Sequence, residues 1–232
     1  MILKDVPKGV WTTKEGQKPI SVTSFAQIGF CEAIPMLERI GVRGLVTRGM
    51  VYGGAWHAAQ ERAEAEGIAT GALKTVSPEE AKALLASGSE VKIGRECVRI
   101  AIPHKKILIR GRIDSARLLP NDGFAVEEDK TVANNSDVLL KGQYLLQVLA
   151  YARGISSLMG LPEKNGICRL NYFFSDGSTR TDELKVGKKE SALLDKSLER
   201  FHQIHHGRKP KPSPCGEKCG FCRFSHGCMY CS

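Results

Sequence analysis

GRIDSARLLPNDGFAVEEDK, residues 111–130, contains two extended runs of apolar residues on either side of the turn sequence PNDG. Turn residues between two extended runs predict an antiparallel hairpin. Side chains two apart on a strand share a face, so Glu128 and Lys130 are expected to point together, while Glu127 and Asp129 point away. Asp114 lies in the preceding run. Two carboxylates and one lysine are therefore predicted to meet on neighbouring strands.

Further strands and helices are expected around this hairpin. Strands are predicted at Cys97–Ile102, Ile107–Leu119, Phe124–Val132, Ile167–Phe174 and Thr179–Val186, the first three as an antiparallel meander. Helical periodicity predicts helices at Phe25–Ile40, Val51–Glu66, Ala81–Ala86, Leu139–Leu158 and Glu190–His205. Thr23 or Ser24 is expected to begin the first helix, and Ser77 caps the third. The pattern predicts an α/β fold with a mixed, mainly antiparallel sheet flanked by helices.

The composition is that of one globular domain with small appended elements. The chain has 232 residues, of which 42% are hydrophobic and 25% charged. Its net charge of +9 favours an anionic partner, of which nucleic acid is the commonest. Residues 1–11 lack the apolar segment of a secretory signal, and no apolar run approaches the ~20 residues that span a bilayer. We therefore expect a soluble cytoplasmic protein without a membrane partner.

Asp114, Glu128 and Lys130 suit phosphodiester hydrolysis. Carboxylate oxygens bind Mg²⁺ or Mn²⁺, the ion activates water and neutralises developing charge, and a lysine stabilises the nucleophile or the phosphate. The alternative is a charged hairpin whose acids are merely exposed to solvent.

Three further polar residues are candidates for the same site. Gln147 and Tyr151 are four apart in an expected helix, hence on one face, where they either position phosphate and a catalytic group or belong to an amphipathic surface. His57 lies in another expected helix and can complete a metal site as a neutral imidazole. A lone helical histidine is, however, more often structural or solvated.

The chain has eight cysteines, five of them in its tail: Cys215, Cys219, Cys222, Cys228 and Cys231. In a reducing compartment this density indicates a metal centre rather than disulfides. The last four form two CxxC pairs five residues apart, whereas zinc ribbons place a longer hairpin between their pairs, so the spacing favours a compact loop around a cluster. Cys97 and Cys168 have apolar neighbours and are expected in the core.

The order and spacing of four motifs resemble the RecB-like branch of the PD-(D/E)XK nuclease superfamily. The motifs are GGAWH at Gly53–His57, GRID at Gly111–Asp114, EDK at Glu128–Lys130 and QVLAY at Gln147–Tyr151. With the cysteines added, the chain resembles the CRISPR-associated iron–sulfur exonucleases, the family of the fourth Cas protein. The resemblance extends from about Ser21 to Cys228 and implies a PD-(D/E)XK nuclease core.

The resemblance also assigns roles to the candidate residues. It implies that His57, Asp114 and Glu128 bind Mg²⁺ or Mn²⁺, with the backbone carbonyl of Asp129 as a further ligand. Lys130 is then the catalytic lysine.

Gln147 and Tyr151 would help to position DNA or the active site. The sequence departs from the family pattern at Asp129, where an apolar residue is usual. Another acid, Glu127, precedes the motif, so either glutamate is a possible ligand, although strand alternation favours Glu128.

For the cysteines, the resemblance implies that Cys31 joins Cys219, Cys222 and Cys228 around an iron–sulfur cluster. Four thiolates suit a [4Fe–4S] cluster, which we expect, and a [2Fe–2S] centre uses the same number. The roles of Cys215 and Cys231 stay open. The expected division is a RecB-like nuclease domain at 1–206 and a basic linker with the cluster segment at 207–232.

The expected function is that of a metal-dependent DNA exonuclease acting on single strands. In the family it would process spacer precursors during CRISPR adaptation, beside the CRISPR integrase. Basic and histidine side chains near the tail either follow the DNA backbone or are solvated: Arg200, His202, His205, His206, Arg208, Lys209, Lys211 and Lys218. Two alternatives are a DNA-binding partner of the integrase with little cleavage and a RecB-like repair or phage nuclease outside CRISPR.

Overall fold

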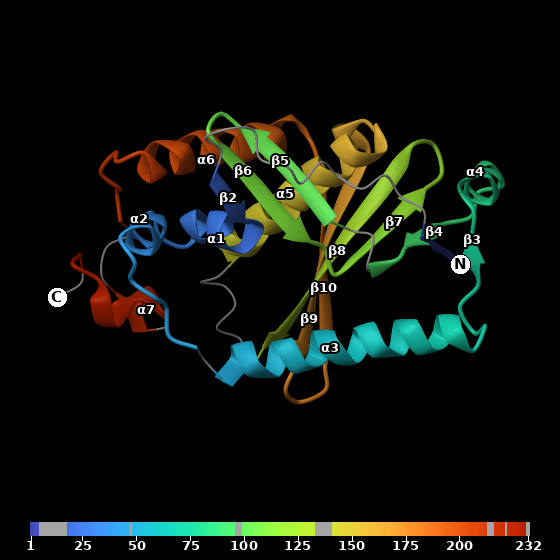
Figure 1. The fold of residues 1–232 in the computed structure, drawn as a ribbon, viewed down its shortest axis with the longest axis horizontal. Coiled ribbons are helices and arrows are strands. Elements are labelled where there is room, and N and C mark those ends of the chain that lie inside the picture. The colour runs from blue at the N-terminus through green and yellow to red at the C-terminus, as the bar shows by residue number, and fades with distance from the viewer. Residues whose placement is uncertain are drawn as a thin grey trace.

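The structure is a computed structural model, which describes residues 1–4, 18–46, 48–95, 99–132, 141–212, 216–220 and 222–230. Within these ranges the strands form two sheets (Figure 1). The larger has the order β10 (Thr179–Lys185), β9 (Gly166–Phe174), β8 (Gly123–Val132), β7 (Ser115–Leu119), β4 (Val91–Ile93), β1 (Ile2–Leu3) and β3 (Thr75–Val76). The smaller has the order β2 (Lys18–Ser21), β6 (Ile107–Arg112) and β5 (Arg99–His104).

The β7–β8 hairpin is confirmed. The two strands are antiparallel, with Ser115 opposite Glu127 and Leu119 opposite Gly123. Asn121 and Asp122 in the turn have φ values of 58° and 56°, which is the left-handed conformation that a tight hairpin turn requires. This turn fixes the register that places Glu128 and Lys130.

The expected meander is wrong at its centre, because Ile107–Leu119 is not one strand. The chain leaves the smaller sheet after β6 and enters the larger one at β7. Asp114 lies at this crossing, where its carboxylate accepts a hydrogen bond from the backbone N–H of Asp129 at 3.0 Å. A side chain thus supplies the hydrogen bond at the point where the chain changes sheets. The hydrophobic pattern did not reveal the change, because both sheets bury the same residue types.

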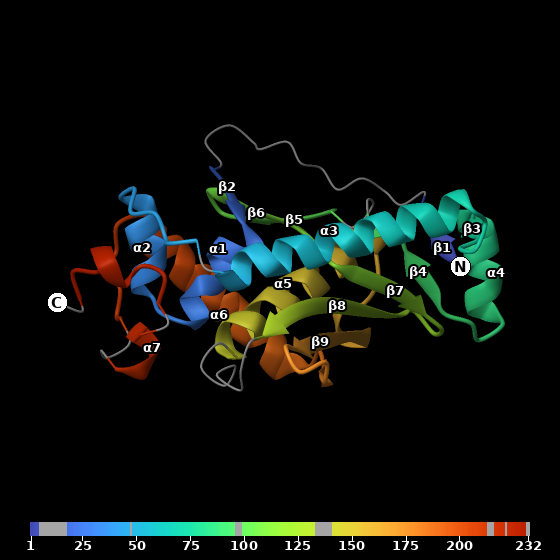
Figure 2. The same cartoon turned by 90° about the horizontal axis from the view of Figure 1, so that it is seen from below.

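The larger sheet is mixed, as predicted, and its parallel pairs include β8 with β9. Helix α5 (Lys141–Met159) connects these strands as the crossover that parallel neighbours need. Gln147 on α5 contacts Glu128, whereas Trp56 on α3 (Arg48–Ala69) packs on Phe173, which faces the other way. Helices α5 and α3 therefore lie on opposite faces of the sheet, as Figures 1 and 2 show.

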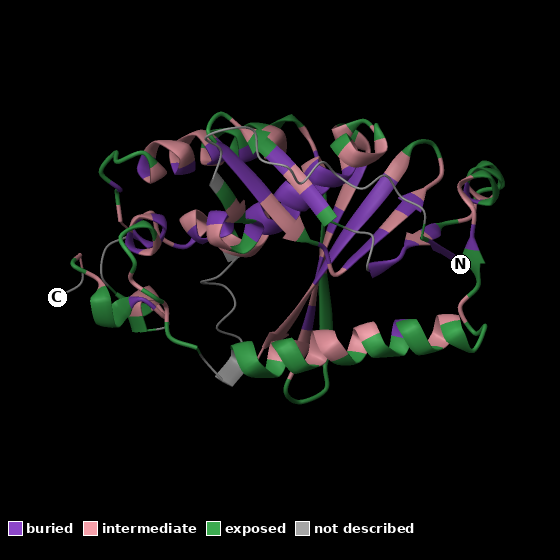
Figure 3. Cartoon of the chain, in the orientation of Figure 1, coloured by how far each residue is buried: buried purple, intermediate pink, exposed green. Residues whose placement is uncertain are grey.

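The main core lies on the α5 face. Phe25, Phe124, Tyr172 and Phe201 are almost fully buried there, the last on α6 (Lys188–His205). Figure 3 shows buried residues along β7, β8 and α5, whereas α3 is mostly exposed or half-buried. The catalytic candidates on β8 and α5 therefore sit in the most rigid part of the fold.

The first expected helix is broken. The structure has α1 (Val22–Ala26), a short 3₁₀ turn at Gln27–Gly29 and α2 (Ala33–Arg39) in place of one helix. Pro35 explains the break, because a proline inside a helix lacks its N–H and clashes one turn back, whereas near the start of a new helix it is tolerated. The cap is Ser21, whose Oγ accepts from the N–H of Ser24 at 2.9 Å, not Thr23 or Ser24. Cys31 lies in the break.

The remaining elements follow the expectations with shifted ends. Helix α4 (Pro78–Ala86) begins with the predicted capping box of Ser77 and Glu80, and α3 extends beyond both expected ends. The β9–β10 hairpin and α6 are confirmed. Strand β5 ends at His104, two residues beyond the predicted end at Ile102, and the chain reverses at Lys105, with φ of 51°. None of the helices in the described ranges combines the length and apolar character needed to cross a bilayer.

Candidate active site

The sheet and α5 bring together the central candidates, which are called the active-site network below: Asp114, Glu128, Lys130, Gln147 and Tyr151. Lys130 Nζ donates to Glu128 Oε1 at 2.6 Å and to Gln147 Oε1 at 3.1 Å. The amide of Gln147 donates to Glu128 Oε1 at 2.6 Å and to the hydroxyl oxygen of Tyr151 at 3.1 Å. Gln147 on α5 therefore orients both Lys130 and Glu128. It lies on the same helix face as Tyr151, as the spacing of four residues predicted.

Burial dominates the electrostatics of this network. Glu128 is 5% exposed, and burial raises the pKa of its carboxyl to about 8; the Lys130 ammonium opposes the rise and the Asp114 carboxylate adds to it. Burial also raises the pKa of Tyr151 well above its ordinary value, with the charge of Glu128 contributing. Two carboxylates held close in a buried place favour a cation or a proton between them.

His57 reaches the network from α3. Its Nδ1 lies 3.3 Å from Asp114 Oδ1. Two buried atoms here, His57 Nδ1 and Glu128 Oε2, have no hydrogen-bond partner among the described residues. A buried polar atom without a partner is costly, and such atoms cluster where a ligand binds.

The donor types therefore fit a divalent cation. Carboxylate oxygens with one imidazole nitrogen suit Mn²⁺ or Mg²⁺. In the described part of the chain, no group of three or more His, Cys, Asp or Glu side chains is already placed to hold one ion. His57, Asp114 and Glu128 are the residues that would hold such an ion.

The other two acids of the motif point away, as strand alternation predicts. Glu127 accepts from Arg117 Nε at 3.1 Å and from Arg169 Nη1 at 3.2 Å. Glu128 is thus the glutamate that faces Asp114 and Lys130. Its role as metal ligand stays a prediction.

The structure accounts for the unusual Asp129. Its carboxylate lies 3.4 Å from Arg95 Nη2 and accepts from the Asn171 amide at 3.1 Å. Arg95 is itself 8% exposed, and its backbone N–H donates to Glu64 on α3 at 2.8 Å. An acid in the middle of a strand is tolerated because a buried arginine neutralises it. The sequence did not reveal Arg95. The only indication of it was that Asp129, an acid in the middle of a strand, required a positively charged partner.

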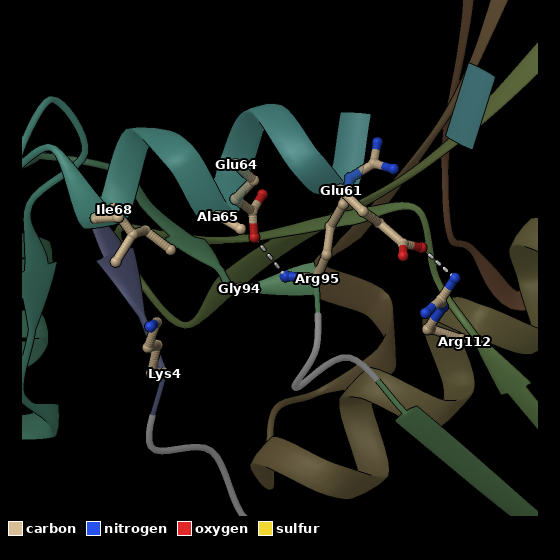
Figure 4. Close-up of a pocket in the computed structure, with 9 residues that line it drawn as sticks. Lys4, Glu61, Glu64, Ala65, Ile68, Gly94, Arg95 and Arg112 are labelled. Atoms are coloured by element: carbon tan, nitrogen blue, oxygen red, sulfur yellow. Dashed lines mark hydrogen bonds and ion pairs between the residues drawn. The ribbon is translucent and has the colours of Figure 1, made fainter. Parts of the chain in front are cut away.

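Arg95 also lines a cavity that sequence reasoning did not anticipate. This cavity, called the α3 cavity below, measures about 280 Å³ and lies between α3 and the chain after β4 (Figure 4). Its lining consists of Lys4, Glu61, Glu64, Ala65, Ile68, Ala69, Gly94, Arg95 and Arg112.

The four cysteines that the family resemblance groups together line one small apolar cavity, called the cysteine pocket below. Cys31 lies before α2, and Cys219, Cys222 and Cys228 lie in the tail, in and after α7 (Glu217–Gly220). Phe30, Ile34, Leu37 and Phe224 form its buried wall. Burial raises the pKa of Cys222, and the other three thiols add to the rise.

The tail is attached to α2, as Figures 1 and 2 show. The N–H of Leu45 donates to the carbonyl of Arg223 at 2.9 Å, and Arg223 Nη2 lies 3.4 Å from Glu38. Arg200, expected near DNA, instead donates to Glu32, which also accepts from the N–H of Lys211 at 2.6 Å. The tail therefore contacts the segment around α2, and Arg200 belongs to this contact.

The other cysteines divide between core and undescribed positions. Cys168 is buried, its Sγ lies 3.6 Å from the carbonyl oxygen of Val148, and burial raises its pKa to about 12, which confirms a core residue. Cys97, Cys215 and Cys231 lie outside the described residues.

No protein-family model matches the chain, and neither does any curated protein. Solved structures share its fold. One, from Eubacterium rectale and provisionally classed as an exonuclease, has a TM-score of 0.50 and 11% identity and covers 91% of this chain and 90% of its own. Another, the alkaline exonuclease from Laribacter hongkongensis, has a TM-score of 0.39 and 13% identity over 82% of this chain and 88% of its own. The chain therefore shares the mixed α/β fold of the Eubacterium rectale protein.

Proposed function

We propose that the protein is a metal-dependent deoxyribonuclease that digests single-stranded DNA from an end. The observation that supports the proposal best is the buried Glu128 beside the half-buried Asp114, with Lys130 and Gln147 bonded to the glutamate. A fold that holds two acids and a lysine close together, largely shielded from water, sacrifices stability, which is typical of a catalytic site. The fold shared with the Eubacterium rectale protein agrees with this reading.

Each residue of the network has a role in the proposed reaction. His57, Asp114 and Glu128 would hold Mg²⁺ or Mn²⁺, with the Asp129 carbonyl as a further ligand. The ion, when bound, would activate water and neutralise charge on the phosphate. The Lys130 ammonium contacts Glu128 and would stabilise the attacking oxygen or the phosphate. Gln147 holds Lys130 and Glu128 in register, and the Tyr151 hydroxyl fixes the Gln147 amide.

The substrate proposal rests on charge and on the family resemblance. The net charge of +9 favours a polyanion. We further propose that the substrate is the precursor of a CRISPR spacer and that the protein acts beside the CRISPR integrase.

We also propose that the cysteine pocket binds an iron–sulfur cluster. Cys31, Cys219, Cys222 and Cys228 supply four thiols from two distant parts of the chain to one apolar cavity. That donor set suits a [4Fe–4S] cluster and also a [2Fe–2S] cluster. Bound there, the cluster would fasten the tail to α2. The test is to purify the protein without oxygen and to assay it for iron and acid-labile sulfide. One equivalent of zinc without sulfide would exclude an iron–sulfur cluster.

Digestion of end-labelled single-stranded DNA tests the proposed activity. With Mn²⁺ present, Lys130→Ala and Asp114→Ala should cut about a hundredfold to a thousandfold more slowly than the wild type, since each removes a group that stabilises transition-state charge. Lys189→Ala, which removes an exposed lysine from α6, is the matched control and should cut normally. Equal cutting by all four proteins would exclude this active site. Binding without cutting by the wild type would favour a DNA-binding partner of the integrase.

A further inference from the structure

The α3 cavity has two chemically different walls. Ala65, Ile68 and Ala69 on α3 present apolar surface. Lys4, Arg95 and Arg112 come from other parts of the chain and carry positive charge. Figure 4 shows these groups around one space, with α3 on one side and Gly94 and Arg95 on the other. A ligand that fits both walls carries an anionic group and an apolar group.

The two carboxylates in the lining do not reverse this charge, because each already has cationic or N–H partners. Glu61 pairs with Arg112. Glu64 accepts from Lys92 Nζ at 2.5 Å and from the backbone N–H of Arg95 at 2.8 Å. A guanidinium has five N–H donors, so one carboxylate partner leaves Arg95 and Arg112 with donors for an anion.

The cavity adjoins the active-site network through three connections. Arg112 precedes Asp114 by two residues, and Glu61 follows His57 by one turn of α3. Arg95 contacts the Asp129 carboxylate at 3.4 Å, and the N–H of Asp129 donates to Asp114 at 3.0 Å. The cavity therefore lies on the α3 face of the sheet and is connected to Asp114 through Arg95 and Asp129.

We propose that the α3 cavity binds the terminal nucleotide of the DNA strand, with its phosphate on Arg95 and Arg112 and its sugar or base against Ala65, Ile68 and Ala69. This proposal rests on the proposed function and adds the reason for a preference for ends. The volume of about 280 Å³ is just below the ~300–1,000 Å³ of pockets for drug-sized ligands. That volume suits a ligand of about the size of one nucleotide.

Calorimetric titration of the metal-free protein tests the cavity without any cleavage. Deoxythymidine monophosphate should bind more tightly than deoxythymidine or inorganic phosphate, because only the nucleotide uses both walls. Ala65→Trp fills the cavity from an exposed position on α3, and Arg112→Gln removes one guanidinium; each should weaken binding at least tenfold. Ala63→Trp, also exposed on α3 but outside the lining, should bind as the wild type does. No binding of the nucleotide, or equal binding by Ala65→Trp, would overturn the proposal.

A second titration distinguishes a strand end from a free nucleotide. An eight-residue oligodeoxythymidine with free ends should bind more tightly than the same strand blocked at both ends with biotin and streptavidin, and Ala65→Trp should remove the difference. Equal affinity of both strands for the wild type would overturn the assignment to strand ends. A protein that shows the expected binding in both titrations and yet cuts no DNA would contradict the proposed function but not the nucleotide cavity.

Discussion

The active-site network lies inside the central sheet, whereas the cysteine pocket lies between α2 and the C-terminal tail at the edge of the molecule (Figure 1). In the network, the hydrogen bonds of Lys130 and Gln147 join β8 to α5, which the main core already holds in place. In the cysteine pocket, a small separate apolar cluster holds short helices together. The network is therefore expected to keep its shape without metal, while the cysteine pocket depends on what binds there.

Loss of the Glu128 charge should separate activity from stability in the network. Glu128→Gln should lower the rate of DNA digestion about a hundredfold or more, because a metal ligand is lost. The unfolding temperature should stay within a few degrees of the wild type, since the glutamine oxygen still accepts from Lys130 and repulsion with Asp114 disappears. Parallel cleavage assays and thermal melts measure both effects. A variant that melts far below the wild type would show that the network depends on this charge for folding.

Loss of one thiol should have the opposite effect in the cysteine pocket. Cys31→Ser should lose bound iron and destabilise the fold by about 3 kcal/mol, because ligand binding there contributes to folding. For a chain of this size this lowers the melting temperature by about 6–12 °C. Cys168→Ala, a core cysteine without proposed ligand role, controls for general cysteine loss and should keep its iron. Normal iron content in Cys31→Ser would remove Cys31 from the ligand set.

The contact between Arg95 and Asp129 supports the network from the α3 face. Asp129→Ala should cost about 2 kcal/mol, since it removes a charged partner from a buried guanidinium. Asp182→Ala, which breaks an exposed pair with Arg180, is the matched control and should cost less than about 1 kcal/mol. Denaturant titration measures both changes. Equal losses of unfolding free energy in the two variants would mean that the pairing of Asp129 with Arg95 does not stabilise the fold.

The smallest effect is expected at α1, which connects the two regions. Ser21→Ala removes the N-cap hydrogen bond to Ser24 and should cost about 1 kcal/mol. Thr23→Ala, at the position that the sequence favoured as a cap, should cost clearly less. Thermal melts of both variants decide between the two positions, and a larger loss at Thr23 would contradict the cap seen in the structure.

The sequence predicted what local rules determine. The hairpin turn at Asn121, the alternation of Glu127 and Glu128 and the capping box at Ser77 depend on neighbours within a few residues, and all three are confirmed. The change of sheet at Asp114 and the partner of Asp129 depend on segments far apart in the chain, so no local pattern contained them. The break before α2 is an intermediate case, because Pro35 marked it and the apolar periodicity concealed it.

Site residues followed the same division. Asp114, Glu128, Lys130, Gln147 and Tyr151 form one bonded network, because motif spacing carries the geometry of a strand and a helix. Arg95 lines the α3 cavity without belonging to any motif, and Arg112 lies in the GRID motif but had no predicted role there, since both positions follow from how α3 crosses the sheet. Residues that act through packing of distant elements are the ones that single-sequence reasoning misses.

Binding of Mn²⁺ to the active-site network tests the central claim most directly. Calorimetric titration of the purified wild type should show one Mn²⁺ bound per chain in addition to any metal in the cysteine pocket, and DNA cleavage should rise with occupancy of that ion. Glu128→Gln should lose the ion, whereas Lys189→Ala should retain it. Undiminished Mn²⁺ binding by Glu128→Gln, or cleavage that is independent of Mn²⁺ and Mg²⁺, would contradict the proposed site.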